Sequence, residues 1–172
     1  MDVRVDIRDW CEADLPALHA INEASVPGVG TLTRDALDRL VREDSAATLV
    51  ADVNGQPAGF VLCMHEGLDY PSLNYKWISQ HYETFAYVDR VAVAADQRGR
   101  RLGEALYDAA MASFSGTRDV LLAEVNLAPP NPGSLRFHKR HGFREIGERW
   151  EIEGEKGVVY LARTLHHRDV RH

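Results

Sequence analysis

Hydrophobic and polar residues recur along the first part of the chain with periods that predict its secondary structure. Apolar and charged side chains alternate over residues 3–7, which is typical of a half-buried strand. Apolar positions spaced three and four apart predict a helix over 14–25, with Asp14 as its cap. The same spacing predicts a second helix over 34–43, capped by Thr33.

Two apolar runs, 48–53 and 58–64, are expected to form neighbouring strands. Asn54 and Gly55 lie between them, and Asn-Gly between apolar runs is the strongest short signal for a hairpin. The chain therefore turns back on itself here with a tight connection.

The centre of the chain is expected to be a strand, a short basic turn and a helix. Val88, Val91 and Val93 favour the strand. Leu102 begins a stretch in which apolar residues recur at helical spacing as far as Ser113. This order, with the turn between strand and helix, is the feature around which the other elements are arranged.

The remaining residues add two strands at the end of the chain and one more strand and helix before them. Residues 120–126 are expected to be a strand. Asn131 is placed to cap the next helix and Gly142 to end it. The last two strands are predicted over 143–152 and 158–165. Strands interleaved with helices predict a mixed sheet with helices on both faces.

Length and composition are those of an ordinary globular protein. The chain has 172 residues, of which 45% are hydrophobic and 27% charged, so one compact domain is expected over 1–165. The polar residues 166–172 are expected to be a frayed tail.

The net charge of −6 argues against a general nucleic-acid or membrane-surface binder. The N-terminus lacks the apolar core of a signal peptide, and no apolar run approaches the ~18 residues of a membrane span. We therefore expect a cytoplasmic protein without nucleic-acid or membrane partners. Cys11 and Cys63 are expected to be buried thiols, and the scattered histidines predict no metal site.

The basic turn over 98–103 holds three arginines and two glycines in an acidic protein. A helix start leaves backbone N–H groups unpaired and carries partial positive charge, and arginines add charge-assisted hydrogen bonds. Small residues let a bulky anion approach the backbone. The turn is therefore expected to bind a phosphate group, with an ordinary turn bearing solvated arginines as the alternative.

A strand that ends in Val-Ala-Val, followed by Arg98, Gly103 and an apolar helix, resembles the acetyl-CoA-binding core of the GNAT superfamily of N-acetyltransferases. The family pattern is Arg/Gln-x-x-Gly-x-Gly/Ala, and Arg101 stands where its inner glycine usually falls. The resemblance extends over about 3–165. It implies an α/β (α+β) fold with a mixed, mostly antiparallel twisted sheet of about seven strands, flanked by about four helices.

The resemblance also implies acetyl-CoA as co-substrate and no metal. Main-chain groups of the central strand would meet the pantetheine arm, backbone N–H groups of the turn would meet the pyrophosphate, and an asparagine at a later helix start would bind the pantetheine. The expected cofactor-binding residues are Val91, Ala92, Val93, Arg98, Gly99, Arg100, Arg101, Leu102, Gly103, Glu104, Asn126, Asn131 and Ser134.

Acyl transfer to an amine requires a general base, because the acceptor ammonium has a reference pKa near ~10.4 and must lose a proton before it attacks. Glu124, expected at the C-terminal end of its strand, stands in the Glu-Val context of the base in family members that acetylate protein N-termini. Its alternative role is an ion pair with a neighbouring arginine. Asp89 is a weaker candidate, which is expected to pair with Arg90 or Arg98 instead.

A general acid would protonate the departing thiolate, and the family often uses a tyrosine that precedes a Gly-Phe pair. His138 takes the place of that tyrosine here. Its reference pKa near ~6.5 suits either an acid or a base at neutral pH. The alternative is a histidine on the helix surface.

We therefore predict an acetyl-CoA-dependent N-acetyltransferase that acts on the amine of a small molecule or of a protein N-terminus. The alternative is a non-catalytic acyl-CoA-binding sensor or interaction module. The aromatic-rich residues 67–85 are expected to be a flap over the acceptor or a contact in a homodimer, or else a short helix that packs its aromatic side chains on the domain.

Overall fold

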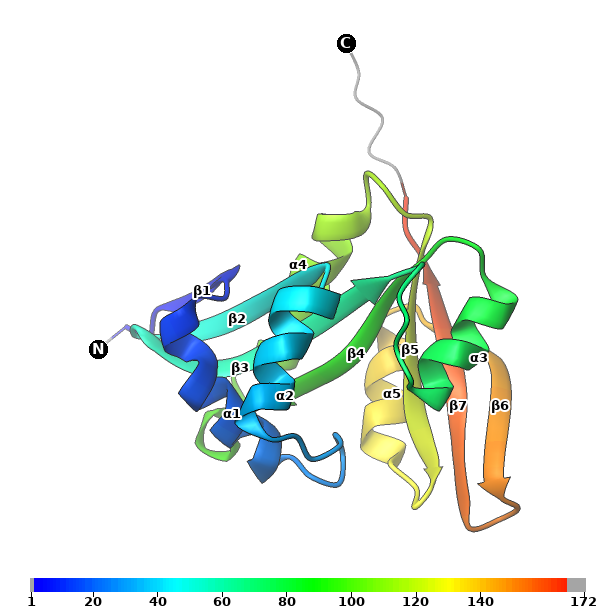
Figure 1. Cartoon of the computed structure of the whole chain (residues 1–172). Coiled ribbons are helices and arrows are strands. Elements are labelled where there is room, and N and C mark those ends of the chain that lie inside the picture. The colour runs from blue at the N-terminus through cyan, green and yellow to red at the C-terminus, as the bar shows by residue number, and fades with distance from the viewer. Residues whose placement is uncertain (1, 167–172) are drawn as a thin grey trace. The chain divides into compact units, whose positions relative to one another are not determined.

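The computed structural model describes residues 2–166, and within that range it contains five α-helices and seven strands (Figure 1). The strands form a mostly antiparallel sheet in the order β1-β2-β3-β4-β5-β7-β6. The predicted fold class is therefore confirmed, with five helices in place of about four. The tail predicted over 166–172 lies, except for its first residue, outside the described residues.

Two compact units make up the chain. Unit 1 consists of Met1–Leu68 and Val88–Ser113, and unit 2 consists of Asp69–Tyr87 and Phe114–His172. The single domain over 1–165 stays a prediction.

The sheet of unit 1 is built on an antiparallel series of strands. It contains β1 (Val5–Asp9), β2 (Ala47–Val53), β3 (Gln56–His65) and the larger part of β4 (Ala86–Val93). Asn54 and Gly55, between β2 and β3, both have positive φ, 53° and 86°, which is the backbone of a type I′ hairpin turn. The predicted hairpin is confirmed.

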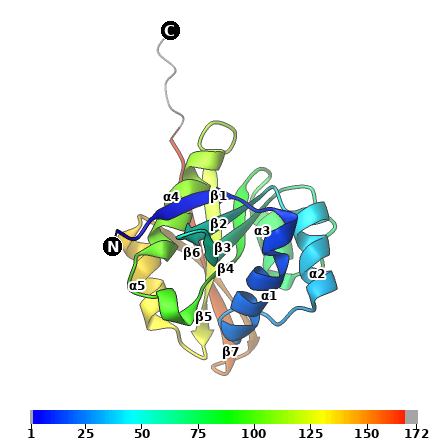
Figure 2. The same cartoon turned by 90° about the vertical axis from the view of Figure 1, so that its left-hand side faces the viewer.

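Helices cover both faces of the sheet of unit 1. Figure 2 shows α1 (Leu15–Ala24) and α2 (Arg34–Arg39) on one face and α4 (Leu102–Phe114) on the other. The Thr33 hydroxyl accepts a hydrogen bond from the N–H of Ala36 at 3.1 Å, so the predicted cap of α2 is confirmed. A π-helical turn, Leu40–Asp44, continues α2 to about the predicted end.

The prediction that Asp14 caps α1 is wrong. Its carboxylate accepts hydrogen bonds from the backbone N–H of Cys11 at 2.8 Å and from both terminal nitrogens of Arg8 at 2.7 and 2.9 Å. The pair with Arg8 also lowers the pKa of Asp14. Cys11 is exposed rather than buried, because it lies in the turn between β1 and α1, whereas Cys63 is buried in β3 as predicted.

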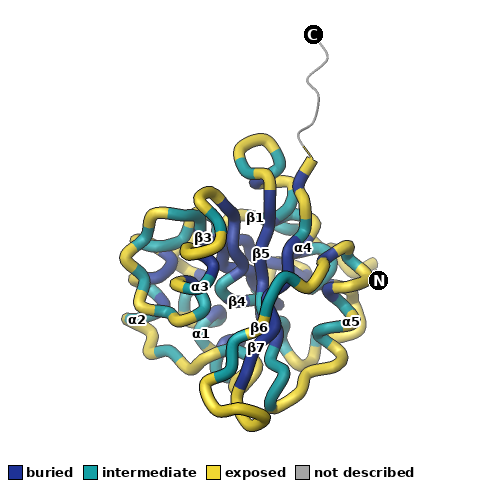
Figure 3. The backbone as a smooth tube through the Cα atoms, turned by 90° about the vertical axis from the view of Figure 1, so that its right-hand side faces the viewer, coloured by how far each residue is buried: buried dark blue, intermediate teal, exposed yellow. Residues whose placement is uncertain are grey.

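Unit 2 combines the start of β4 with β5 (Val120–Ala128), β6 (Arg144–Ile152) and β7 (Lys156–Thr164). β4 and β5 pair in parallel at two positions, Ala86 with Leu121 and Tyr87 with Leu122. β5 with β7 and β7 with β6 are antiparallel. Figure 3 colours most of β5 and β7 dark blue, because their central residues form the apolar interior of this unit.

The two helices of unit 2 are α3 (Leu73–His81) and α5 (Pro132–Arg140). α3 lies within the aromatic-rich segment 67–85, so the short-helix alternative is the one the structure bears out. Ser72 caps α3 by accepting from the N–H of Tyr75 at 3.3 Å, and the buried Tyr75 ring packs edge-on against Phe85. The α5 predictions are confirmed: Asn131 accepts from the N–H of Ser134, and Gly142 has a φ of 81°.

Candidate active site

The turn between β4 and α4 is exposed and presents its arginines to solvent. A single 3₁₀ turn, Ala95–Gln97, leads from β4 into it, and Arg98, Arg100 and Arg101 are all exposed. The carbonyl of Arg101 accepts the first helical hydrogen bond, from the N–H of Ala105 at 3.1 Å. The amides of 102–104 therefore belong to the first turn of a long helix, where no carbonyl one turn earlier is available within the helix.

The backbone of this turn is left-handed at two residues. Gly99 has a φ of 87° and Arg101 a φ of 57°. Glycine adopts such a backbone without penalty, whereas an L-residue with a side chain loses roughly 1–2 kcal/mol. Arg101 thus keeps the conformation that a glycine would favour at this position, so the loss of the family glycine has not removed the left-handed turn.

The strand that precedes the turn is held very close to its neighbour β3. A Cβ atom at Gly59 would lie 2.9 Å from the carbonyl oxygen of Ala92 and 3.3 Å from a methyl group of Val93. The N–H of Ala94 also donates to the carbonyl of Ala58 at 2.8 Å. Gly59 is therefore needed for β3 and β4 to approach so closely, and the sequence analysis did not single it out.

A buried arginine in the middle of β4 is bonded to α1 and to the loop after it within unit 1. The Arg90 side chain donates to the side-chain oxygen of Asn22 at 2.9 Å and to the carbonyl of Gly30 at 3.0 Å. Its Nε donates to Asp89 at 3.1 Å, so the expected pairing of Asp89 with an arginine is confirmed. The cluster ties the loop after α1 to the central strand.

In unit 2, Glu124 accepts hydrogen bonds from two neutral side chains. The Tyr87 hydroxyl donates to Oε1 of Glu124 at 2.9 Å, and the Asn74 amide donates to the same oxygen at 3.2 Å. Glu124 lies in the middle of β5 rather than at its C-terminal end as predicted, because the strand continues to Ala128. Tyr87 is almost fully buried. Its side of the hydrogen bond to the carboxylate is therefore shielded from solvent.

A chain of hydrogen bonds continues from Asn74 to an arginine. Oδ1 of Asn74 accepts from the Tyr160 hydroxyl at 2.9 Å and from Nη2 of Arg149 at 3.1 Å. Nε of Arg149 in turn donates to the Tyr160 oxygen at 3.0 Å. Burial raises the pKa of Tyr160, which keeps its hydroxyl protonated and able to donate.

His138 is buried in α5 and does not lie on the helix surface. Its Nδ1 lies 2.7 Å from the Ser134 carbonyl, and its ring packs edge-on against Phe143. Burial lowers the pKa of His138, so the neutral imidazole is favoured at pH 7. The catalytic role of this residue stays a prediction.

The three polar residues of unit 2 that were predicted to bind cofactor lie around the connection from β5 to α5, with Asn126 in β5 and Asn131 and Ser134 at the start of α5. The backbone N–H of Asn131 donates to the Asn126 carbonyl at 3.3 Å, while its side-chain oxygen accepts from Ser134. Asn131 thus closes the connection between β5 and α5 by itself. Its binding of pantetheine stays a prediction.

A model of the Acetyltransferase (GNAT) family matches residues 6–143, which is most of the chain. The chain belongs to this family. The family resemblance predicted from the sequence is thereby confirmed.

Among individual relatives of this GNAT protein is an uncharacterized N-acetyltransferase of Methanocaldococcus jannaschii, 32% identical over 107 residues. The match covers 62% of this chain and 42% of that relative, so this chain corresponds to less than half of the relative's length.

Solved structures show the same fold. The ribosomal-protein-S18-alanine N-acetyltransferase from Escherichia coli has a TM-score of 0.73 at 18% identity, with 98% of this chain and 99% of that chain covered. NAA60 from Arabidopsis thaliana, solved with a bisubstrate analogue, has a TM-score of 0.74 at 18% identity, with 96% and 100% covered.

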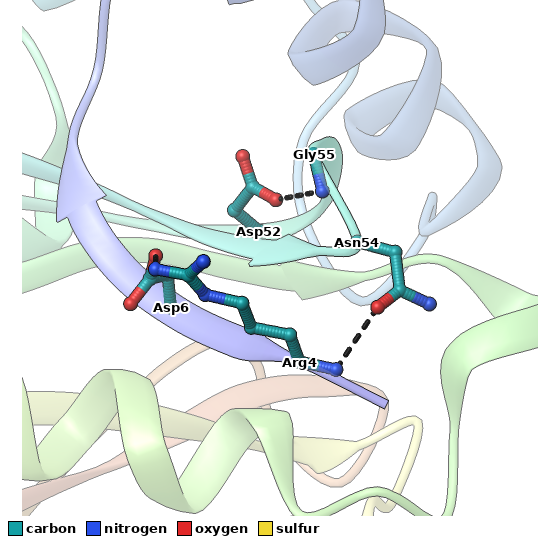
Figure 4. Close-up of a pocket in the computed structure, with 5 residues that line it drawn as sticks. All are labelled: Arg4, Asp6, Asp52, Asn54 and Gly55. Atoms are coloured by element: carbon teal, nitrogen blue, oxygen red, sulfur yellow. Dashed lines mark hydrogen bonds and ion pairs between the residues drawn. The ribbon is translucent and has the colours of Figure 1, made fainter. Parts of the chain in front are cut away.

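Apart from these clusters, unit 1 of this GNAT protein has a surface hollow of about 330 Å³ beside the β2–β3 hairpin. Figure 4 shows that Asn54 accepts from the N–H of Arg4, and that Asp52 accepts from the N–H of Gly55. These groups stabilise the hairpin turn and the end of β1, and no residue predicted for cofactor or catalysis lines the hollow.

Within residues 2–166, no cluster of three or more histidine, cysteine or acidic residues has metal-binding geometry. No helix of this range combines the length and the apolar character needed to cross a bilayer.

Sequence reasoning missed Tyr87 and Asn74. Tyr87 reads as an apolar strand residue, and Asn74 belongs to a segment in which no period was found. Residues two apart in a strand lie on the same face, so Tyr87 shares a face of β4 with Asp89, the weaker base candidate. This spacing was the signal in the sequence that could have pointed to Tyr87.

Proposed function

We propose that this protein transfers an acetyl group from acetyl-CoA to the amine of a protein N-terminus or of a small molecule. The observation that carries the proposal is the Tyr87–Glu124 pair, a carboxylate and a phenol 2.9 Å apart inside unit 2. A carboxylate can remove a proton from an ammonium, and a phenol can return one to a leaving group. The base predicted from the sequence thus has a proton-carrying neighbour.

The reaction forms one bond and breaks one. The amine nitrogen bonds to the carbonyl carbon of the thioester, and the carbon–sulfur bond breaks. Glu124, directly or through a water, accepts the proton that the ammonium loses. The nitrogen gives up a second proton, to the base or to solvent, as the tetrahedral intermediate collapses to the amide. The thiolate leaves with a reference pKa near ~8.5 and takes up a proton from an acid or from solvent.

Two side chains qualify for the acid. Tyr87 is already a donor to Glu124, and His138 is the acid predicted from the sequence. Because the imidazole of His138 is buried and neutral at pH 7, a role as hydrogen-bond partner suits it better than a role as proton donor. We therefore assign the first choice to Tyr87.

Acetyl-CoA binding is proposed for the turn before α4. The first amides of a long helix, three exposed arginines and two left-handed residues make a cradle in which backbone N–H groups can approach a diphosphate. Val91, Ala92 and Val93 would then offer main-chain groups to the rest of the molecule. The fit supports the co-substrate that the family uses.

A protein N-terminus is the acceptor we place first. The E. coli structural neighbour acts on an alanine of a ribosomal protein according to its name, and the plant neighbour was solved with a bisubstrate analogue. A small-molecule amine is the second acceptor class. A homodimer and a cytoplasmic location stay predictions.

The competing function is a sensor that binds acyl-CoA without turnover. The Tyr87–Glu124 pair argues against this function. A sensor needs only the turn of unit 1 to hold the diphosphate, and it does not require a hydrogen-bonded carboxylate and phenol inside unit 2.

The test has a binding arm and a turnover arm. Calorimetry is expected to show that acetyl-CoA binds. Arg98→Ala should weaken this binding by about five-fold, because one exposed charge-assisted hydrogen bond is lost. Arg39→Ala, at an exposed position of α2, should leave the affinity unchanged. Release of free thiol is then followed with a panel of peptides and small amines. Binding without thiol release from any amine would establish the sensor instead.

A further inference from the structure

The amide of Asn74 stands between an arginine and the proposed base. Its Nδ2 donates to Oε1 of Glu124, while its Oδ1 accepts from Arg149 and from Tyr160. The four side chains come from α3, β5, β6 and β7, so the arrangement depends on the tertiary structure of unit 2.

The direction of these hydrogen bonds is fixed by the arginine. A guanidinium has only donors, so Nη2 of Arg149 must face the oxygen of the Asn74 amide. Nε of Arg149 also donates to the Tyr160 oxygen, which turns the Tyr160 hydroxyl hydrogen toward the same Asn74 oxygen. With both donors on one side, the amide presents its NH₂ group to Glu124. In a flipped amide, the Asn74 oxygen would face the carboxylate of Glu124, and its NH₂ group would face the guanidinium of Arg149. Neither contact could then be a hydrogen bond.

Packing holds α3 in the position that this chain of bonds requires. The Trp77 ring stacks on Tyr160 with ring centroids 3.9 Å apart. Gly147 on β6 makes room for it, since a Cβ there would lie 2.6 Å from the indole. Two residues earlier in the helix, the Tyr75 ring lies 6.2 Å from the Tyr87 ring, measured between centroids. The helix is therefore packed against β6, β7 and the start of β4 through residues next to Asn74.

We propose that Asn74, oriented by Arg149 and Tyr160, is a positioning residue for Glu124. Its NH₂ group donates to one carboxylate oxygen and favours the ionised carboxylate, which is the form in which Glu124 can accept a proton. The proposal rests on the proposed function. Among the described residues, the charged or titratable groups hydrogen-bonded to Glu124 or to its partner Asn74 include Tyr87 from β4, Tyr160 from β7 and Arg149 from β6.

The decisive variant is Asn74→Asp, which keeps the size of the side chain and replaces the NH₂ donor by an oxygen. One oxygen can still accept from Arg149 and Tyr160, while the other faces Glu124 as a second carboxylate. Two carboxylates at hydrogen-bond distance do not both ionise readily, so the acidic limb of the pH profile of kcat/KM is expected to move up by about one pH unit. At pH 7 we expect kcat/KM to fall on the order of ten-fold, with the KM for acetyl-CoA unchanged.

Gln80→Glu is the matched control, because it makes the same amide-to-carboxylate change at an exposed position of the same helix. It should leave both the pH profile and kcat/KM as they are. Tyr160→Phe is the second variant, which keeps the stacking on Trp77 and removes only the hydroxyl. We expect a fall of kcat/KM of about two- to five-fold, and the effects of Asn74→Ala and Tyr160→Phe should not add.

A measurement without turnover separates this proposal from the proposed function. The carboxyl carbon of Glu124 is followed by NMR on protein labelled at glutamate, with Glu124→Gln identifying its signal. A titration that moves to higher pH in Asn74→Asp and not in Gln80→Glu supports the positioning role even if no acceptor amine is found. An unchanged Glu124 titration and pH profile in Asn74→Asp overturn it, whereas a wild type that turns over no amine overturns the proposed function alone.

Discussion

The turn of unit 1 and the polar cluster of unit 2 use different means to prepare a site. At the turn, backbone geometry is decisive: Gly99 and Arg101 are left-handed, and the side chains around them are exposed. Around Glu124, side-chain hydrogen bonds of 2.9 to 3.2 Å form a network within the packed unit. Backbone N–H groups can bind a phosphate whatever side chains the residues carry. The pKa of an oriented side chain, in contrast, can be adjusted by its neighbours for proton transfer.

This difference has a consequence for how mutations act. A change at the turn should alter affinity for a diphosphate and leave the chemistry alone, because its donors are amides that every residue supplies. A change in the cluster should alter the chemical step and leave affinity for the co-substrate alone, because each member has a partner of its own. The first of the four predictions that follow tests that separation, and the other three test the packing, burial and backbone strain of the two units.

The largest effect is expected from Glu124→Gln. Loss of the base should lower kcat by about 10²-fold or more, while the Kd for acetyl-CoA measured by calorimetry stays the same. Glu155→Gln, in the exposed turn between β6 and β7, is the control and should retain full turnover. If kcat of Glu124→Gln equals that of the wild type across the pH range, Glu124 takes no part in the mechanism.

Next in size is Gly59→Val, which tests the close approach of β3 and β4 in unit 1. A side chain there would meet the Ala92 carbonyl, which belongs to the backbone and cannot move aside. We expect the free energy of unfolding to fall by about 2 kcal/mol, measured by urea denaturation. The matched change Gly116→Val, where a Cβ meets nothing within 4 Å, should cost much less. Equal losses in both variants would contradict the role given to Gly59.

A smaller effect concerns the buried imidazole of unit 2. Burial lowers the pKa of His138 in the folded state, and the unfolded chain has a pKa near ~6.5, so the unfolded state binds the proton more readily. The stabilisation is therefore full above about pH 6.5 and is lost as the pH falls. His138→Gln should lose less stability than the wild type between pH 7 and pH 5, by on the order of 1 kcal/mol in denaturant titrations. Parallel curves for the two proteins would show that His138 titrates alike in both states.

The smallest effect is expected at Arg101, where two variants remove the same charge. Arg101→Gly relieves the left-handed strain at some entropic cost, and Arg101→Ala retains the strain. The glycine variant should be more stable than the alanine variant by about 0.5–1 kcal/mol in thermal and denaturant unfolding. Identical stabilities would mean that the positive φ at this residue carries no strain.

Much of the local structure followed from short-range signals. Asn54 and Gly55 predicted their hairpin because both must adopt positive φ, and Thr33 and Asn131 predicted helix starts because their oxygens reach amides within the same turn. Asp14 has the same chemistry but does not cap its helix, because its carboxylate oxygens accept from Arg8 of the strand and from the N–H of Cys11 instead. A signal read from neighbours in sequence holds until a partner from elsewhere competes for the same atoms.

The candidate site divides in the same way. The basic turn could be found from its arginines and glycines, since it is contiguous and its donors lie on consecutive backbone atoms. Asn74 could not be found, because its helix is short and shows no clear period, and its value lies in three partners from other strands. Tyr87 and His138 were likewise settled by burial, which depends on what packs around them.

By itself, the sequence determined the order of the strands and of the helices other than α3, the position of the turn proposed to bind an anion, and the carboxylate that serves as candidate base. These are properties of residues close together in the chain, where spacing and backbone preference are enough. Only the tertiary structure decided that Glu124 faces a phenol and an oriented amide, that Arg101 occupies a left-handed backbone, and that the segment 67–85 contains the packed helix α3. Hydrogen bonds and packing between distant segments have a direction and a distance, and those exist only once the segments have met.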